Sequence, residues 1–87
     1  MDIRKLLGAN VRRYRLSASL SQEAVAVRMG ADRAFVSQIE RGGQNVTLLT
    51  IHHLSEALGV RPVDLLDDSA ESDENAIEPR PVEPDGA

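Results

Sequence analysis

Two short helical patterns separated by a tight turn occupy residues 20–42, and they constrain the fold of the whole chain. Ser21 precedes the first pattern as an N-cap, and Gly30 can end it because glycine readily adopts the left-handed conformation. Asp32 caps the second pattern, and Gly42 stops it. The apolar residues of each pattern lie three or four positions apart and therefore share one helix face. They are Val25 and Met29 in the first pattern, and Val36 and Ile39 in the second.

A small residue allows these two helices to cross closely. Ala26 lies at the expected crossing point, and the whole segment is the pattern of a helix-turn-helix, whose second helix can enter the major groove of DNA. The segment resembles the helix-turn-helix of the Cro and phage-repressor type, the xenobiotic-response-element family of bacterial regulators. The resemblance covers roughly residues 3–66. The segments that carry it are 20–23, 29–30, 36–42, 45–48 and 57–60.

The rest of the chain fits an all-α fold, a compact bundle of five short helices of the lambda-repressor-like type. We expect the first helix over residues 2 to about 18. The fourth helix should begin after Thr47 as its N-cap and end at Gly59. Pro62 suits the first position of a last helix over 62–66. We expect residues 1–66 to form one DNA-binding domain. The apolar residues expected to face the core are Ile3, Leu7, Val11, Tyr14 and Ala18 in the first helix, and Leu48, Ile51, Leu54 and Leu58 in the fourth.

The net charge of −4 is unusual for a DNA-binding protein until the chain is divided. Residues 1–66 contain nine Lys or Arg and six Asp or Glu, a balance of +3. Residues 67–87 contain eight Asp or Glu and one Arg, a balance of −7. Because residues 67–87 also have few large apolar side chains, we predict that they form a disordered acidic tail.

The sequence gives no reason to expect a cofactor, a metal, a small-molecule effector or an enzyme active site. Cysteine is absent, and His52 and His53 are neighbours that point in different directions on a helix. No nucleophile–base set or phosphate-binding loop is recognisable. No apolar run approaches the roughly 18 residues that a membrane-spanning helix needs, and the N-terminus lacks a signal-peptide hydrophobic block. We therefore expect a cytoplasmic protein without membrane contact.

The exposed face of the predicted helix 32–41 carries the candidates for reading DNA bases. Arg33 can donate twice to a guanine edge, and Gln38 can pair with an adenine edge. Each is alternatively an ordinary exposed helix residue. Phe35 has two open roles, a contact at the groove wall or a place at the edge of the core. The resemblance implies base reading by Arg33, Ala34, Ser37 and Gln38.

The resemblance also implies phosphate contacts at the start of the second helix and around the turn that follows the third. Side chains and free N–H groups at a helix start bind phosphate well, and glycines in a turn allow a close approach. The candidates are Ser21, Gln22, Arg41, Gly43, Gln44 and Asn45. The family further implies a partly buried ion pair between Arg15 and Glu40, and a simple surface arginine is the alternative.

A single recognition helix contacts only roughly four or five base pairs, so we expect a homodimer that reads two half-sites. The candidate interface consists of Leu49, His52, Arg61, Val63 and Leu65. The resemblance thus implies a sequence-specific transcriptional regulator that occupies operator DNA. Residues 33–37 and 45–48 are particularly similar to the controller proteins of restriction–modification systems. An antitoxin-like module whose acidic tail or helices bind a protein partner is the alternative, because acidic disordered segments can fold on a basic partner.

Overall fold

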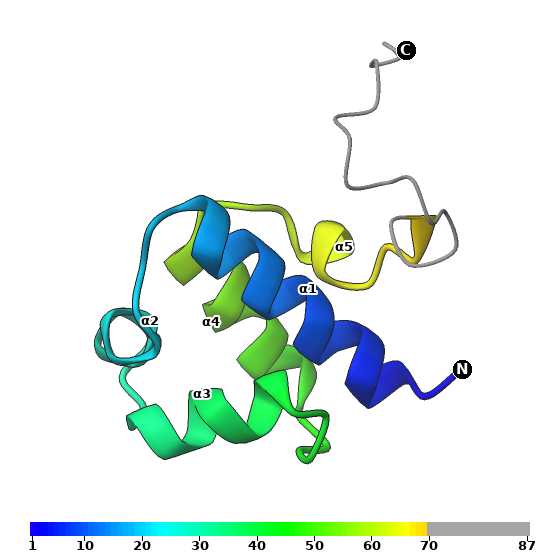
Figure 1. Cartoon of the computed structure of the whole chain (residues 1–87), viewed down its shortest axis with the longest axis horizontal. Helices are drawn as coiled ribbons and strands as arrows, with labels where there is room; N and C mark the ends of the chain where they lie inside the picture. Colours follow the sequence, from blue (N-terminus) through cyan, green and yellow to red (C-terminus); the bar gives the residue numbers. More distant parts are fainter. Residues whose placement is uncertain (70–87) are drawn as a thin grey trace, which may run out of the picture.

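The computed structural model describes residues 1–69, of which residues 1–66 contain five α-helices (Figure 1). No β-strand occurs among the described residues, and the predicted all-α bundle of five helices is confirmed. The predicted acidic tail covers residues 67–87, and its residues 70–87 lie outside the described part of the chain. The helices are α1 (Ile3–Ser17), α2 (Gln22–Met29), α3 (Arg33–Glu40), α4 (Leu48–Leu58) and α5 (Pro62–Leu65).

The first four helices each begin at a side chain that accepts a hydrogen bond from an otherwise unpaired backbone N–H group. At their other ends, α2 and α4 stop at Gly30 and Gly59, whose φ angles of 73° and 72° are left-handed. Local sequence rules therefore define most of the helix ends. The capping residues are Asp2, Ser21, Asp32 and Thr47, of which the last three were predicted.

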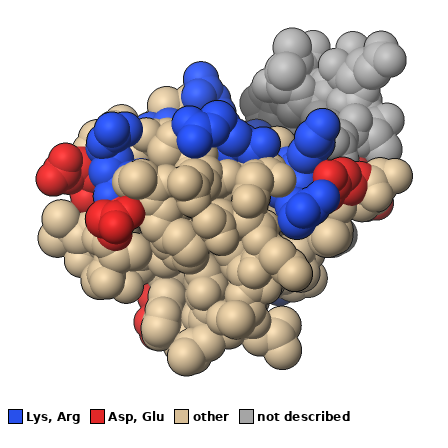
Figure 2. Space-filling model, turned by 90° about the horizontal axis from the view of Figure 1, so that it is seen from below, with Lys and Arg blue, Asp and Glu red and all other residues tan. Residues whose placement is uncertain are grey.

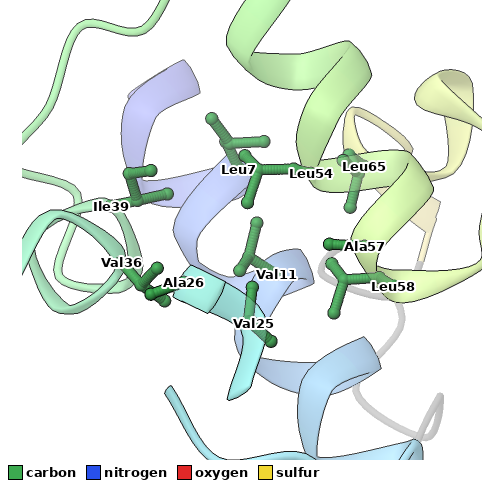
Figure 3. Close-up of a cluster of buried hydrophobic side chains, with 10 residues drawn as sticks. All are labelled: Leu7, Val11, Val25, Ala26, Val36, Ile39, Leu54, Ala57, Leu58 and Leu65. Atoms are coloured by element: carbon green, nitrogen blue, oxygen red, sulfur yellow. The ribbon is translucent and has the colours of Figure 1, made fainter. Parts of the chain in front are cut away.

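All five helices contribute to a single aliphatic core (Figure 3). α1 contacts α3, α4 and α5, whereas α2 packs against α3 and α4. This packing leaves one long side of α3 facing away from the core, and that side carries the predicted recognition residues. The core residues are Leu7, Val11, Val25, Ala26, Val36, Ile39, Leu54, Ala57, Leu58 and Leu65.

Three apolar residues that we expected inside are exposed. Leu48 is 84% exposed because it is the first residue of α4, well before the fully buried part of the helix begins at Leu54. Ile3 occupies the same position at the start of α1, and Ala18 lies just beyond the end of that helix. Conversely, Leu6 is buried although it is not among the residues that we expected to face the core. The prediction of core-facing residues is therefore correct in the middle of α1 and α4 and wrong at their ends.

Gly8 allows the backbones of α1 and α3 to touch. A Cβ atom at this position would lie 2.3 Å from the carbonyl oxygen of Ile39 and 2.7 Å from that of Glu40. Both neighbours are backbone atoms, so no side-chain rotation relieves the contact. Glycine in a helix interior costs stability relative to alanine, and here the close approach of α3 requires it.

Asn10 is a buried polar residue that the sequence analysis did not single out. Its side-chain Nδ2 donates to the carbonyl oxygens of Leu65 at 2.8 Å and Asp67 at 3.0 Å, and its Oδ1 accepts from Arg13 at 3.2 Å. These bonds satisfy the buried amide and attach α5, together with the backbone that follows it, to α1. Asp67, which begins the predicted acidic tail, therefore lies close to Arg13 of α1.

Candidate nucleic-acid interface

The α2–turn–α3 unit forms through the small and apolar residues that the sequence predicted. Ala26 on α2 is buried in the same cluster as Val36 and Ile39 on α3. The N–H group of Ala31 donates to the carbonyl of Ala26 at 2.9 Å and tightens the turn behind Gly30. Residues two positions apart in a helix point to nearly opposite sides. Because Val36 and Ile39 are buried, the opposite side of α3 faces solvent.

The predicted base-reading residues lie together on the outer side of α3. Arg33, Ala34 and Gln38 are exposed, and Ser37 is half-buried. Phe35 is half-buried and packs against the core cluster, so of its two open roles the structure supports the edge of the core. The outer side of α3 is thus polar, apart from one small apolar residue.

Each polar residue on this side contacts a predicted phosphate-binding residue. Arg33 Nη1 donates to Gln22 Oε1 at 3.3 Å, and Arg41 Nη1 donates to Ser37 Oγ at 2.8 Å. The side-chain amide of Gln44 donates to Gln38 Oε1. Residues from α2, from α3 and from the turn after α3 therefore form one continuous polar surface. Because Arg33, Gln38 and Arg41 are exposed, they can exchange their present partners for DNA.

A buried ion pair lies beneath this surface. Arg15 Nε is 2.6 Å from Glu40 Oε2, and Arg15 Nη2 donates to Glu40 Oε1 at 3.0 Å, a two-pronged geometry. Only 9% and 4% of the two side chains are exposed, and Arg15 Nη1 also donates to the carbonyl of Leu20. The hydrogen bond to Glu40 raises the pKa of Arg15 above its ordinary value, although burial acts in the opposite direction. Arg15 therefore stays charged, and its contact with Glu40 ties the end of α3 to α1.

Gln22 connects the buried ion pair to the exposed Arg33. Its Nε2 donates to Glu40 Oε1 at 3.1 Å, while its Oε1 accepts from Arg33. An ionised carboxylate only accepts and a guanidinium only donates, so this orientation of the amide is the one that satisfies both neighbours. Gln22 thereby holds the Arg33 guanidinium at the start of α3.

The turn after α3 uses one of the amides that we assigned to phosphate binding. Gly42 has a left-handed φ of 78°, and its N–H donates to Ile39, while the N–H of Gly43 donates to Gln38 at 2.9 Å. These two bonds close the C-terminus of α3 and engage the Gly43 amide within the chain, so phosphate binding by Gly43 stays a prediction. The backbone N–H groups of Gln44 and Asn45 make no such bond among the described residues.

Four of the five residues predicted for the dimer surface are exposed. Leu49, His52, Arg61 and Val63 are exposed on α4, on α5 and between these helices. Leu65, in contrast, is fully buried in the core, so its assignment to the interface is wrong. A helix of four residues has too little periodicity to reveal its inner face in the sequence. Leu48 is exposed as well, and it lies four residues before His52 on α4, so the two share a helix face.

The Lys and Arg side chains of residues 1–69 divide into those that form ion pairs and those that do not. Figure 2 views the side on which α3 lies in Figure 1, and Lys and Arg gather along one edge of this face. Three of the nine Lys and Arg in residues 1–69, namely Arg4, Arg15 and Arg61, form ion pairs with carboxylates of that region. The other six have no carboxylate partner there. They are Lys5, Arg12, Arg13, Arg28, Arg33 and Arg41.

Residues 1–69 offer neither a metal site nor a membrane span. No three His, Cys, Asp or Glu side chains in this region are grouped so that they could hold a metal ion. His52 lies instead beside Glu56, with 3.4 Å between its Nε2 and Glu56 Oε2. None of the helices in the same region is long and apolar enough to cross a bilayer.

Comparison with known proteins identifies the family. A family model described as a helix-turn-helix domain matches residues 6–68. The control protein C.BamHI of Bacillus amyloliquefaciens is 51% identical over 67 residues, which are 76% of this chain and 83% of the relative. The crystal structure of the restriction-modification controller protein C.AhdI from Aeromonas hydrophila has a TM-score of 0.69 at 39% identity, covering 71% of this chain and 90% of that chain.

A third similar protein has been solved with DNA. The controller protein C.Esp1396I, a tetramer in complex with its natural 35 base-pair operator, has a TM-score of 0.69 at 25% identity. The match covers 75% of this chain and 86% of that chain. The present chain belongs to the helix-turn-helix family of DNA-binding transcriptional regulators. It is similar to restriction–modification controller proteins, as the sequence predicted.

Proposed function

We propose that this protein binds an operator as a homodimer and reads the major groove with the outer side of α3. The arrangement of α3 supports this proposal most directly. Its inner side is locked into the core by Val36 and Ile39, and its outer side presents Arg33 and Gln38 to solvent. DNA of a bacterial cytoplasm is then the target, and the protein acts as a regulator there.

Base reading follows from the chemistry of the exposed residues. The Arg33 guanidinium matches the O6 and N7 acceptors of guanine, and the Gln38 amide matches the N6 and N7 edge of adenine. Ala34 is small and apolar enough to contact a thymine methyl group, and the Ser37 hydroxyl can donate or accept. Gln22 holds Arg33 in place before DNA arrives, which reduces the freedom that Arg33 loses on binding.

Phosphate groups would be held on both sides of α3. The Ser21 hydroxyl already accepts from the N–H of Ala24, and its own hydrogen remains available for a phosphate oxygen. Beyond α3, the Arg41 guanidinium and the backbone amides of Gln44 and Asn45 supply donors. Such contacts fix the position and orientation of the protein on the duplex, while the base contacts select the sequence.

Dimerisation would use the apolar surface on α4 and α5 that includes Leu48, Leu49 and Val63. These are large side chains left exposed on elements whose inner sides fill the core. The similar controller protein C.Esp1396I is a tetramer on its operator, which supports a multi-subunit mode of binding. Two copies related by a two-fold axis would place their α3 helices in successive major grooves, about 34 Å apart.

Replacement of the base-reading side chains tests this assignment. We expect Arg33→Ala and Gln38→Ala each to cost about 1–3 kcal/mol of binding free energy at the best site. Each change should also relax the preference at one base pair of every half-site, because only that base loses its partner. The measurement is selection of bound sequences from a random DNA library by the parent and by each variant.

Val27→Ala serves as the matched control, because Val27 is exposed on α2 and belongs to none of the predicted contacts. It should select the same sequences as the parent with the same affinity. If the Arg33 and Gln38 variants also select the parental sequences unchanged, the outer side of α3 is not the base-reading surface.

A further inference from the structure

We propose that the acidic C-terminal segment, residues 70–87, binds the cationic surface of its own domain and competes there with DNA. The proposal rests on the DNA-binding function proposed above and adds a means of regulating it. Residues 70–87 contain six Asp or Glu and one Arg, whereas residues 1–69 contain nine Lys or Arg and eight Asp or Glu. The two parts of the chain therefore carry opposite net charge.

The cations of the domain are available for such a contact. Six of its Lys and Arg side chains lack a carboxylate partner within residues 1–69, and five of the six belong to α1, to α3 or to the C-cap of α3. α1 and α3 pack directly against each other, so the helices that carry these side chains are neighbours in the bundle. The five are Lys5, Arg12, Arg13, Arg33 and Arg41.

The path of the chain brings the acidic segment to this surface. Asn10 binds the carbonyl of Asp67 and, through its other side-chain atom, the guanidinium of Arg13. The acidic segment therefore starts from a point fixed on the basic helix α1. Eighteen further residues can extend at most about 60 Å, whereas the longest dimension of the molecule is 36 Å. All five of these cations are therefore within reach of the segment.

Attachment to the same chain makes a weak contact effective. An intramolecular group acts at an effective concentration in the millimolar range, and no defined geometry is needed for carboxylates to screen guanidinium groups. Arg33 and Arg41 are among the residues proposed to meet DNA, so carboxylates beside them must leave before DNA binds. The segment would weaken contacts with nonspecific DNA most, since these depend almost entirely on phosphate charge.

A full-length variant with a neutral segment of the same length provides the matched comparison. Its side chains keep their size and lose their charge. The substitutions are Glu71→Gln, Asp73→Asn, Glu74→Gln, Glu78→Gln, Glu83→Gln and Asp85→Asn. We expect this variant to bind nonspecific DNA about threefold or more tightly than the parent at about 50 mM salt. The difference should vanish near 1 M salt, where the Debye length is only about 3 Å.

A second measurement detects the contact without DNA. The chain contains no cysteine, so Ala87→Cys gives a single attachment point for a nitroxide spin label. In the labelled parent at low salt, amide NMR signals of α1 and α3 should broaden, and they should recover at high salt. The same label on the neutral variant should leave those signals sharp. Signals that stay sharp in the parent at low salt would overturn the proposal.

The two measurements separate this proposal from the function on which it rests. Broadened signals together with superimposable DNA-binding curves would show a contact that does not compete, and would overturn the proposal. Failure of both proteins to bind any DNA at low salt would refute the proposed function and the competition together. In that case the NMR signals would still decide whether the segment binds its own domain.

Discussion

Replacing Gly8 by alanine should cost at least about 3 kcal/mol of unfolding free energy, although alanine is the better helix former by about 1 kcal/mol. The new Cβ would lie 2.3 Å from the carbonyl oxygen of Ile39, far inside van der Waals contact. To relieve this clash, α3 must move away from α1 by about an ångström. That movement loosens the packing of Ile39 and pulls on the Arg15–Glu40 pair, since Glu40 belongs to the same contact.

Urea unfolding followed by circular dichroism, at one fixed protein concentration, measures this loss. A domain of about 70 residues has a total stability of roughly 4–10 kcal/mol, so much of the variant could be unfolded without denaturant. Gly59→Ala is the matched control, because its Cβ would meet nothing within 4 Å and only the left-handed φ of 72° causes strain. It should lose about 1–2 kcal/mol. A Gly8→Ala protein as stable as the parent would contradict the close backbone contact.

Removal of either member of the buried ion pair should be similarly damaging. Arg15→Ala leaves the Glu40 carboxylate buried with Gln22 as its remaining side-chain partner, and Glu40→Ala leaves a buried guanidinium. We expect each change to cost about 3–5 kcal/mol, because an uncompensated charge remains out of contact with water. The double variant should lose less than the sum of the two single variants, since it leaves no isolated charge.

A double-mutant cycle from chemical denaturation at neutral pH provides the measurement. Arg4→Ala is the control, because the Arg4–Asp2 pair is largely exposed and should contribute little to stability. Losses at Arg15 and Glu40 that simply add would mean that the two side chains do not depend on each other. That outcome would be incompatible with the two-pronged contact.

The helix-turn-helix could be predicted from the sequence because local rules determine its parts. Ser21, Asp32 and Thr47 cap helices through their own side chains, and Gly30 ends α2 through its own backbone conformation. None of these roles depends on distant residues. The Arg15–Glu40 pair differs, because 25 positions separate its members and no local pattern connects them. It was predicted only from the family resemblance.

The errors arose where tertiary packing decides the environment of a residue. Leu65 and Leu48 are both apolar residues at a helix end, yet the first is buried and the second is exposed. Leu65 is buried because α5 packs against α1 and α4, and Asn10 binds the Leu65 carbonyl there, whereas Leu48 begins α4 outside the core. The role of the Gly43 amide as a helix cap was missed for a related reason, since two consecutive glycines after a helix suit both a cap and a phosphate site.

The central claim is that two copies of this chain read a symmetric operator with the outer side of α3. Selection of bound sequences from a random DNA library by the full-length protein tests it most directly. We predict a two-fold symmetric site whose half-sites are centred about 10 base pairs apart, with a guanine and an adenine among the most strongly selected bases. Enrichment of a single asymmetric site, or no enrichment at all, would contradict the claim.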